Sequence, residues 1–218
     1  MVQHVVERCR ESGAFQEIYV ATDSPRIAEA ASQVGAKALM TSENCATGTD
    51  RLAEALQHMA CPPQAVLVNV QGDEPALHPQ ALRQLVENFR PDLDMATLVR
   101  PLKAEEAQNP NVVKVALSMQ GRALYFSRAL IPHARTQTPP QRWAHIGLYA
   151  YSPAALLRMA GHPPSPLELA ESLEQLRALE MGLSVLCIPC QYASVAVDTP
   201  EDVPLVEAAL KTLYASHF

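Results

Sequence analysis

Two acidic residues stand where apolar stretches of the chain end. Asp73 follows "VLVNVQG", and Asp198 follows "VAV". In open parallel α/β sheets, ligands bind at the carboxyl ends of the strands, so both carboxylates are expected at the edge of the sheet where a ligand binds. Two carboxylates that leave coordination positions for water and phosphate oxygens suit Mg²⁺ when it is bound to a nucleotide. Asp73 and Asp198 are therefore predicted as metal ligands.

Each acid also has a purely structural interpretation. Asp73 could cap the helix that begins near "HPQALRQL", although His78 is nearer to that cap. Asp198 precedes "TPED", and an Asp before Thr-Pro-Glu is a good helix cap. Without a cation, two facing carboxylates would repel each other and the pKa of one would rise. For Asp198, the metal interpretation has the same weight as the cap interpretation only because Asp198 is paired with Asp73.

Two further turns carry polar groups at places where a ligand could bind. In "ATGTDRLAEA", hydroxyls and free backbone N–H groups lie at a predicted helix N-terminus, which suits an anion or the edge of a base. The alternative is a plain Thr/Asp cap with Arg51 in solvent. "VATDSP" is a strand-end turn that carries Thr22 and Asp23, in which Ser24 could simply be a helix cap.

The segment "HIGLYAY" places an imidazole and two phenols on one face of a strand, because side chains alternate with period two. His145, Tyr149 and Tyr151 could bind a polyol or a carboxylate there. A half-buried strand that uses Tyr as a core residue is an equally ordinary interpretation.

In "AESLEQLRALE", the residues Glu171, Glu174 and Arg177 follow one another at helical spacing. The default prediction for such a pattern is a solvated helix face with salt bridges. Glu174 and its neighbour Gln175 gain a functional interpretation only from the resemblance described below.

Strands and helices alternate through the first hundred residues, and the strands are apolar on both faces. This pattern predicts an α/β fold with a mostly parallel central sheet covered on both sides. The first helix shows the i, i+3, i+4, i+7 stripe and ends at Gly13. The expected helices of this part are 2–13, 24–35, 47–60 and 78–89, and the expected strands are 17–22, 36–40, 65–71 and 95–100.

The pattern changes after Pro101. A hairpin is expected over 111–127, and with the strand 145–152 it predicts a small outlying sheet, at about 101–152, within a single domain of 1–218. One long helix is expected over 165–182, capped by Ser165 and ended by Gly182. Strands at 183–189 and 193–198 and a helix at 199–214 complete the chain.

Composition excludes several kinds of function. The chain has 218 residues and a formal net charge of −6, which predicts no nucleic-acid partner. No apolar run reaches the roughly 18 residues that span a bilayer, so no membrane association and a cytoplasmic location are expected. The five cysteines are expected to be reduced thiols. "CIPC" lacks the second pair that a zinc site needs, so Cys187 and Cys190 are predicted as small apolar residues of a strand.

Taken together, these motifs resemble one family over nearly the whole chain. The order of "YVATDSPRI", "GTDRLAEA", "NVQGDEP", "NPNVVKV", "RALYFSRALIP", "HIGLYAY", "SPLELAESLEQLRALE" and "VDTPEDV" is similar to that of the 3-deoxy-manno-octulosonate cytidylyltransferases, the CMP-Kdo synthetases. "NVQGDEP", "LEQLRALE" and "VDTPED" are specific in combination, whereas each alone is weak.

This resemblance implies a three-layer αβα nucleotidyltransferase fold, a homodimer formed through the outlying sheet, and a reaction of CTP with Kdo that gives CMP-Kdo and pyrophosphate for lipopolysaccharide synthesis. Asp73 and Asp198 match the family's Mg²⁺ ligands and are the predicted catalytic residues. The matches to the nucleotide pocket are Thr22, Asp23, Thr49, Asp50, Arg51 and Gln71. The matches to the sugar side are His145, Tyr149, Glu174 and Gln175, and Arg142 is a further candidate partner of the Kdo carboxylate.

The resemblance also implies a strand and a glycine-rich, cationic phosphate loop before the first helix, and neither stands in this sequence. We therefore expect this chain to lack one strand-and-loop unit and to turn over CTP poorly. Two alternatives remain open beside a CMP-Kdo synthetase. One is a cytidylyltransferase for another acidic sugar such as sialic acid, against which "HIGLYAY" and "LEQLR" argue, and the other is a non-catalytic remnant.

Overall fold

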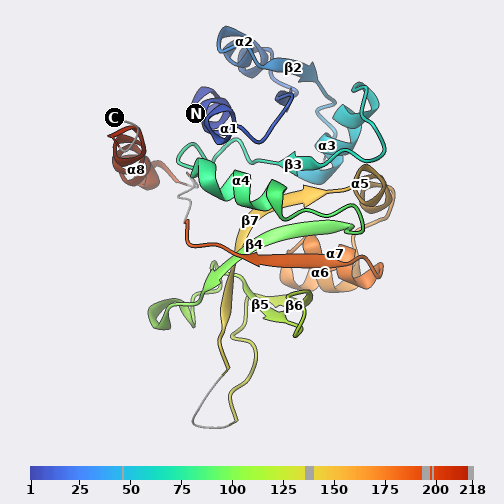
Figure 1. The fold of residues 1–218 in the computed structure, drawn as a ribbon, viewed down its shortest axis with the longest axis vertical. Coiled ribbons are helices and arrows are strands. Elements are labelled where there is room, and N and C mark those ends of the chain that lie inside the picture. Colours follow the sequence, from blue (N-terminus) through green and yellow to red (C-terminus); the bar gives the residue numbers. More distant parts are fainter. Residues whose placement is uncertain (46, 136–139, 193–196, 198, 216–218) are drawn as a thin grey trace. The chain divides into compact units, whose positions relative to one another are not determined.

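The structure is a computed structural model that describes residues 1–45, 47–135, 140–192, 197 and 199–215, without the side chains of residues 214 and 215. The chain divides into two compact units (Figure 1). Unit 1 comprises residues 1–62, 68–87 and those from 192 onward, and unit 2 comprises residues 63–67 and 88–191. This division does not test the prediction of a single domain over residues 1–218, which stays a prediction.

Unit 1 is built on a parallel strand pair flanked by helices. Its register joins Tyr19 to Lys37 and Thr22 to Met40. The strands are β1 (Tyr19–Thr22), β2 (Lys37–Met40) and the short β3 (Leu67–Asn69), which leads into this unit. The helices are α1 (Val2–Ser12), α2 (Pro25–Gln33), α3 (Gly48–Gln57), α4 (Pro79–Glu87), the 3₁₀ turn η2 (Pro200–Asp202) and α8 (Val203–Ala215).

The first helix forms as its apolar stripe predicts. Val5, Val6 and Cys9 are buried, and Gly13 ends the helix in the left-handed conformation with φ 63°. Glycine adopts this conformation without the steric cost that a Cβ would bring. The Arg83 guanidinium, in the middle of α4, donates from Nε to the Ser12 carbonyl at 2.9 Å, which ties the end of α1 to α4.

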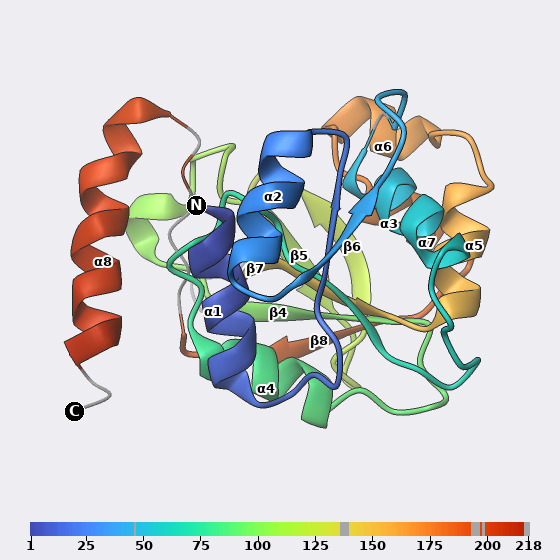
Figure 2. The same cartoon turned by 90° about the horizontal axis from the view of Figure 1, so that it is seen from above.

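The second and eighth helices bury small apolar faces in unit 1. Val6, Ala31 and Ala36 form one core cluster, and α1 and α2 lie side by side (Figure 2). Val206 and Leu210 of α8 pack against Ala76 in another cluster. The expected strand 193–198 lies, except for Val197, outside the described residues.

Unit 2 contains a mixed sheet with the strand order β6-β5-β7-β4-β8. Only β4 and β8 of this order are parallel, whereas β7 runs antiparallel to both β4 and β5. The strands are β4 (Met95–Pro101), β5 (Lys114–Leu117), β6 (Ala123–Ser127), β7 (Trp143–Tyr151) and β8 (Val185–Pro189). The helices are η1 (Ala104–Glu106), α5 (Pro153–Ala160), α6 (Pro166–Glu171) and α7 (Gln175–Glu180).

The prediction of an α/β fold is confirmed, but the sheet of unit 2 is mixed rather than mostly parallel. The first five residues of β4 are buried, which is why the strand reads as continuously apolar. Such burial reports that both faces of a sheet are covered and carries no information on the direction of neighbouring strands. The predicted hairpin is β5–β6, and it continues this sheet through β7 instead of forming a separate one.

The prediction of one long helix over 165–182 is wrong. Ser172 adopts a left-handed conformation with φ 53°, which ends α6 after Glu171, and α7 begins at Gln175. In a continuous helix, residues nine apart would be separated by about 13.5 Å along the axis. The break instead brings Arg177 onto Glu168 at 2.5 Å in a buried ion pair.

Helix α5, the two cysteines near β8 and the apolar character of the helices bear on the remaining sequence predictions. Helix α5 was not predicted, although Ser152 at its cap and Pro153 at its first turn are ordinary start signals. Cys187 and Cys190 are both buried, as predicted, but only Cys187 lies on a strand, because β8 ends at Pro189. None of the described helices is long and apolar enough to cross a membrane.

Candidate functional site

Arg51 joins three chain segments at the carboxyl ends of the parallel strands of unit 1. Its Nη2 donates to Asp23 Oδ2 at 2.8 Å, and its Nη1 donates to Thr41 Oγ1 at 2.7 Å. The interpretation of Arg51 as a solvated side chain is therefore wrong. Its side chain is 23% exposed and that of Asp23 is 36% exposed, so both stay within reach of a ligand.

The start of α3 lies against the amide side chains of Asn69, the last residue of β3, and Gln71, two residues further on. Thr47 caps the helix, because its Oγ1 accepts the Asp50 N–H at 3.2 Å, which confirms the Thr cap. A Cβ at Gly48 would lie 3.2 Å from Gln71 Nε2 and 3.7 Å from Asn69 Nδ2. Glycine at this position therefore allows the side chain of Gln71 to approach the helix N-terminus, where backbone N–H groups favour an anion or a base edge.

The remaining nucleotide-side predictions fall in the same region of unit 1. Thr22 is buried at the end of β1, and its Oγ1 accepts the Ser24 N–H at 3.1 Å, so the hydroxyl orders the turn that carries Asp23. Thr49 is buried in the first turn of α3, and Gln71 is exposed. We call this set the strand-end cluster: Thr22, Asp23, Thr49, Asp50, Arg51 and Gln71.

Asp73 sits in a turn beside the chain segment that leads to Asp198. The Glu74 N–H donates to the Gln71 carbonyl at 3.3 Å, and the Val197 N–H donates to the Asp73 carbonyl at 2.8 Å. Gly72 is not among the residues with positive φ, so this turn does not need the left-handed conformation. Asp198 itself lies outside the described residues. Within the described ranges no group of three or more His, Cys, Asp and Glu side chains could hold a metal.

The structural alternative for Asp73 is filled by another residue, and the turn after Asp198 is closed by a capping box. His78 Nδ1 accepts the Gln80 N–H at 3.1 Å, so the first turn of α4 is capped by His78, as its position predicted. The Thr199 N–H donates to Asp202 Oδ2 at 2.8 Å in a capping box at η2. The first turn of α4 therefore has a cap other than Asp73, whereas the interpretation of Asp198 as a cap stays a prediction because Asp198 lies outside the described residues.

In unit 2, an irregularity of β7 brings two predicted sugar-side rings together. Thr97 pairs with Tyr149 and Leu98 pairs with Ile146, so Gly147 and Leu148 are extra residues in β7. Residues four apart on a regular strand are about 13 Å apart. The rings of His145 and Tyr149 lie only 5.2 Å apart, because this bulge shortens the strand between them.

The rings of His145 and Tyr149 are partly buried and uncharged. The ring of Phe126 meets that of His145 edge-on at 5.2 Å. Burial lowers the pKa of His145 to about 3. Burial also raises the pKa of Tyr149 well above its usual value, and Tyr151 and Glu174 add to that rise through their charge. His145 is therefore a neutral imidazole and Tyr149 a neutral phenol near pH 7.

The buried ion pair of α6 and α7 fixes the start of α7, where Glu174 and Gln175 lie. Burial opposes the ionisation of Glu168, but hydrogen bonds from Arg177 and from the Ser165 N–H outweigh it and lower the pKa. Arg177 also donates from Nη1 to the Met159 carbonyl at 3.1 Å. The prediction of a solvated, salt-bridged face that includes Arg177 is wrong, because Arg177 is 2% exposed.

The other two residues of that predicted face also have defined environments. The Glu171 carboxylate accepts from Ser127 Oγ at 2.7 Å and from the Arg128 N–H at 2.9 Å. Gln175 is buried at the start of α7, and Glu174 occupies its N-cap position. Arg142 donates from Nη2 to the Pro132 carbonyl at 3.2 Å, and its Nε is buried without a partner among the residues that the structure describes.

Sequence reasoning missed Thr97, which is fully buried in β4. Its Oγ1 lies 2.9 Å from His145 Nε2, 3.1 Å from the Ile146 carbonyl and 2.8 Å from the Leu148 carbonyl. The only sequence signal is a hydroxyl within the apolar run "MATLV". We call Thr97, His145, Tyr149, Glu174 and Gln175 the bulge cluster.

Both clusters lie in a chain that matches a known family along most of its length. The family model described as "Cytidylyltransferase" matches residues 1–185. The chain therefore belongs to the cytidylyltransferase family, a class of nucleotidyltransferases.

Within this class, the similarity points to one kind of enzyme. The 3-deoxy-manno-octulosonate cytidylyltransferase of Myxococcus xanthus (strain DK1622) is 52% identical over 213 residues, which cover 97% of this chain and 86% of the relative. The enzyme of the same name from Bdellovibrio bacteriovorus (strain HD100) is 42% identical over 97% of this chain and 87% of the relative. The resemblance found in the sequence is thereby confirmed.

Solved structures agree with the sequence comparison. A structure of CMP:2-keto-3-deoxy-manno-octonic acid synthetase complexed with CTP matches with a TM-score of 0.90 and 37% identity, and the match covers 97% of this chain and 87% of that one. A 4-diphosphocytidyl-2C-methyl-D-erythritol synthase matches with a TM-score of 0.65 at 12% identity, which shows the fold alone. The predicted nucleotidyltransferase fold is confirmed by these matches.

Proposed function

We propose that this chain transfers CMP from CTP to Kdo, giving CMP-Kdo and pyrophosphate for lipopolysaccharide biosynthesis. The observation that carries the proposal is the 52% identity with a 3-deoxy-manno-octulosonate cytidylyltransferase across 97% of this chain. The five thiols are free in the structure, which agrees with action in the reducing cytoplasm.

The strand-end cluster is the proposed nucleotide site. The N-terminus of α3 offers backbone N–H groups, and the Gln71 amide beside Gly48 offers both a donor and an acceptor. Arg51 is held by Asp23 and Thr41, so its guanidinium keeps one orientation without a ligand. A pre-organised cation and fixed N–H groups suit CTP, whose recognition needs both charge and a base edge.

We propose Asp73 and Asp198 as the residues that would hold Mg²⁺. The chemistry of two carboxylates fits this ion, and the Val197 N–H bonded to the Asp73 carbonyl brings the neighbouring backbone alongside. When bound, Mg²⁺ would offset the negative charge on the phosphate oxygens. His78 caps the helix after Asp73, which leaves the Asp73 carboxylate for this task.

The proposed reaction is a displacement at the α-phosphorus of CTP. A hydroxyl oxygen of Kdo forms the new O–P bond, the bond from that phosphorus to the bridging oxygen breaks, pyrophosphate leaves, and the hydroxyl proton passes to solvent. Phosphoryl transfer of this kind depends mostly on positioning and charge neutralisation. The bulge cluster supplies neutral hydrogen-bonding groups for the sugar, and Arg142 is the proposed partner of its carboxylate.

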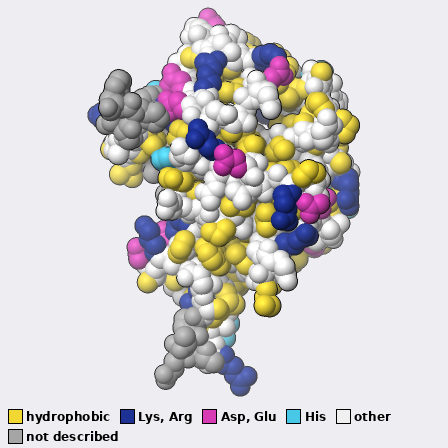
Figure 3. Space-filling model, in the orientation of Figure 1, with side chains coloured by type: hydrophobic (Ala, Val, Ile, Leu, Met, Phe, Trp, Pro, Cys, Tyr) yellow, Lys and Arg dark blue, Asp and Glu magenta, His cyan; other side chains and the backbone are white. Residues whose placement is uncertain are grey.

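We further propose a homodimer formed through the β5–β6 hairpin and β7. Met119 in the hairpin turn is 100% exposed and Leu124 on β6 is 62% exposed. Figure 3 shows hydrophobic side chains gathered over the sheet of unit 2 on the face in view. Exposed apolar groups on an edge hairpin favour association. Sedimentation of the 218-residue chain should give a dimer, and a monomer at all concentrations would refute this part.

Pyrophosphate release tests the function. The chain is incubated with Mg²⁺ and CTP, together with Kdo, a sialic acid or no sugar. The expected result is release with Kdo that exceeds release with the other acid at least about tenfold. Equal or greater release with the sialic acid would assign a different sugar. If neither sugar gives more release than the reaction without sugar, while calorimetry still shows CTP binding, the protein binds nucleotide without transferase activity.

A further inference from the structure

The hydroxyl of Thr97 has three hydrogen-bonding neighbours but only one hydrogen. Its Oγ1 lies 3.1 Å from the Ile146 carbonyl oxygen and 2.8 Å from the Leu148 carbonyl oxygen, and these two carbonyls flank Gly147 in the bulge of β7. Carbonyl oxygens only accept, so the hydroxyl hydrogen must point at one of them. The Leu148 carbonyl has the shorter contact.

The third neighbour is His145 Nε2, which lies 2.9 Å from the same hydroxyl oxygen. Because the hydroxyl hydrogen is already committed to a carbonyl, Oγ1 can only accept from Nε2. The opposite arrangement, in which Thr97 donates to Nε2, would leave its lone pairs facing two carbonyl oxygens at 2.8 and 3.1 Å. That arrangement is repulsive in a fully buried site, where such contacts are poorly screened.

We propose that Thr97 is a positioning residue that fixes His145 as its Nε2–H tautomer and thereby leaves Nδ1 as a hydrogen-bond acceptor. Within the described part of the chain, Nδ1 has no hydrogen-bond partner. This inference rests on the proposed function in one respect, because it assigns Nδ1 to a hydroxyl group of the sugar acid. An acceptor suits a sugar hydroxyl, which can donate, and does not suit the carboxylate, which cannot.

The surroundings of the ring support a fixed tautomer. The edge contact with Phe126 and the neighbouring ring of Tyr149 restrict rotation of the imidazole about its χ2 angle. Burial favours the neutral ring, so both tautomers are candidates near pH 7 and a hydrogen-bond partner decides between them. Thr97 is the partner that does so, and the same hydroxyl also holds the bulge that brings His145 to Tyr149.

The test reads the tautomer directly by ¹⁵N NMR of the whole chain labelled at histidine, at pH 7.5. His145→Gln identifies the His145 signals. The wild-type spectrum should show Nε2 protonated and Nδ1 unprotonated. Thr97→Ser keeps the hydroxyl and should keep this pattern, whereas the isosteric Thr97→Val should lose it in favour of a mixture. A protonated Nδ1 in the wild type, or an unchanged tautomer in Thr97→Val, would overturn the proposal.

Steady-state kinetics separate this proposal from the proposed function. Thr97→Val should raise the KM for Kdo about tenfold with little change in the KM for CTP, and Thr97→Ser should restore it. If the tautomer changes as expected but no KM changes, the tautomer assignment stands and the sugar-side role of His145 is wrong. If the wild-type spectrum shows the other tautomer, the assignment to Thr97 fails whatever the enzyme does.

Discussion

The two units of this protein carry polar groups in two different ways. In unit 1, the strand-end cluster lies in turns and at a helix N-terminus, and it includes a partly exposed ion pair of Arg51 and Asp23. In unit 2, the bulge cluster lies in the middle of strands and at the start of α7, where Thr97 and Gln175 are buried and His145 is uncharged. The difference suits a triphosphate in one unit and a polyhydroxy acid in the other.

The two clusters are also expected to contribute differently to the stability of the protein. A partly exposed ion pair contributes little to stability, so Arg51 and Asp23 can exchange partners with a ligand at small cost. A buried polar group must keep its hydrogen bond, so changes in the bulge cluster affect stability and binding together.

Replacing Asp73 by Asn should lower Mg²⁺-dependent turnover about a thousandfold, because the amide removes a charge that would hold the metal beside the phosphates. The fold should persist, since the Asp73 carbonyl and not its side chain accepts the Val197 N–H. Turnover with CTP and Kdo is measured by pyrophosphate release, and circular dichroism checks folding.

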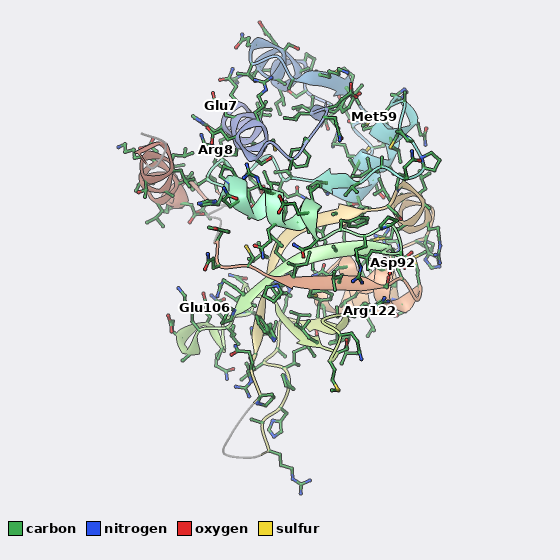
Figure 4. All side chains as sticks on the ribbon, viewed as in Figure 1. Glu7, Arg8, Met59, Asp92, Glu106 and Arg122 are labelled. Carbon is green, nitrogen blue, oxygen red and sulfur yellow. The ribbon has the colours of Figure 1, made fainter. Side chains whose placement is uncertain are left out.

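The matched control for this change is Asp92→Asn. Asp92 lies in the loop between α4 and β4 (Figure 4), and its side chain is 64% exposed beside Arg90. This variant should keep wild-type turnover. A rate for Asp73→Asn within tenfold of the wild type at saturating Mg²⁺ would remove Asp73 from the metal site.

Breaking the buried ion pair should destabilise the protein by about 3–5 kcal/mol, because Arg177→Met leaves the Glu168 carboxylate buried without its cation. Urea unfolding followed by circular dichroism measures the change. The exposed pair of Lys37 and Glu17 is the matched comparison, with side chains 59% and 50% exposed. Lys37→Met should cost far less than Arg177→Met, because water already solvates both exposed charges. Equal losses for the two variants would refute the contrast.

The neutral His145 predicts a pH dependence of stability. Its pKa in the folded state is about 3, below the ordinary value of 6.5, so the unfolded chain binds a proton between these values and the folded chain does not. Stability is therefore lost as the pH falls below about 6.5. Between pH 7.5 and 5.5, the wild type should lose about 1 kcal/mol more free energy of unfolding than His145→Gln. Parallel losses in urea titrations would show that His145 is not held neutral.

Two glycine substitutions should have small effects, and they compare the space around one glycine of unit 1 with that around one glycine of unit 2. A Cβ at Gly48 would crowd Gln71 Nε2 at 3.2 Å, whereas a Cβ at Gly147 would meet nothing within 4 Å. Gly48→Ala should raise the KM for CTP a few-fold, since the amide must move by only a few tenths of an ångström. Gly147→Ala should leave both KM values and stability unchanged. A large loss from Gly147→Ala would mean that glycine, and not Thr97, maintains the bulge.

Sequence reasoning succeeded where function follows from local order along the chain. The helix ended by Gly13 and the strand before "QGD" could be predicted, because a helix end or a strand is encoded within a few neighbouring residues, whereas the metal role of Asp73 stays a prediction. The break at Ser172 could not, because it depends on a buried ion pair between residues nine apart. Thr97 was missed for the same reason, since its partners lie 48 to 51 residues away.

In the proposed arrangement, the strand-end cluster recognises CTP and the bulge cluster recognises Kdo. It is tested most directly by the KM values of both substrates in Arg51→Ala, Glu174→Gln and the double variant. Arg51→Ala should raise only the KM for CTP and Glu174→Gln only the KM for Kdo, each about tenfold. The double variant should show both increases unchanged. A selective effect of Glu174→Gln on the KM for CTP would contradict it.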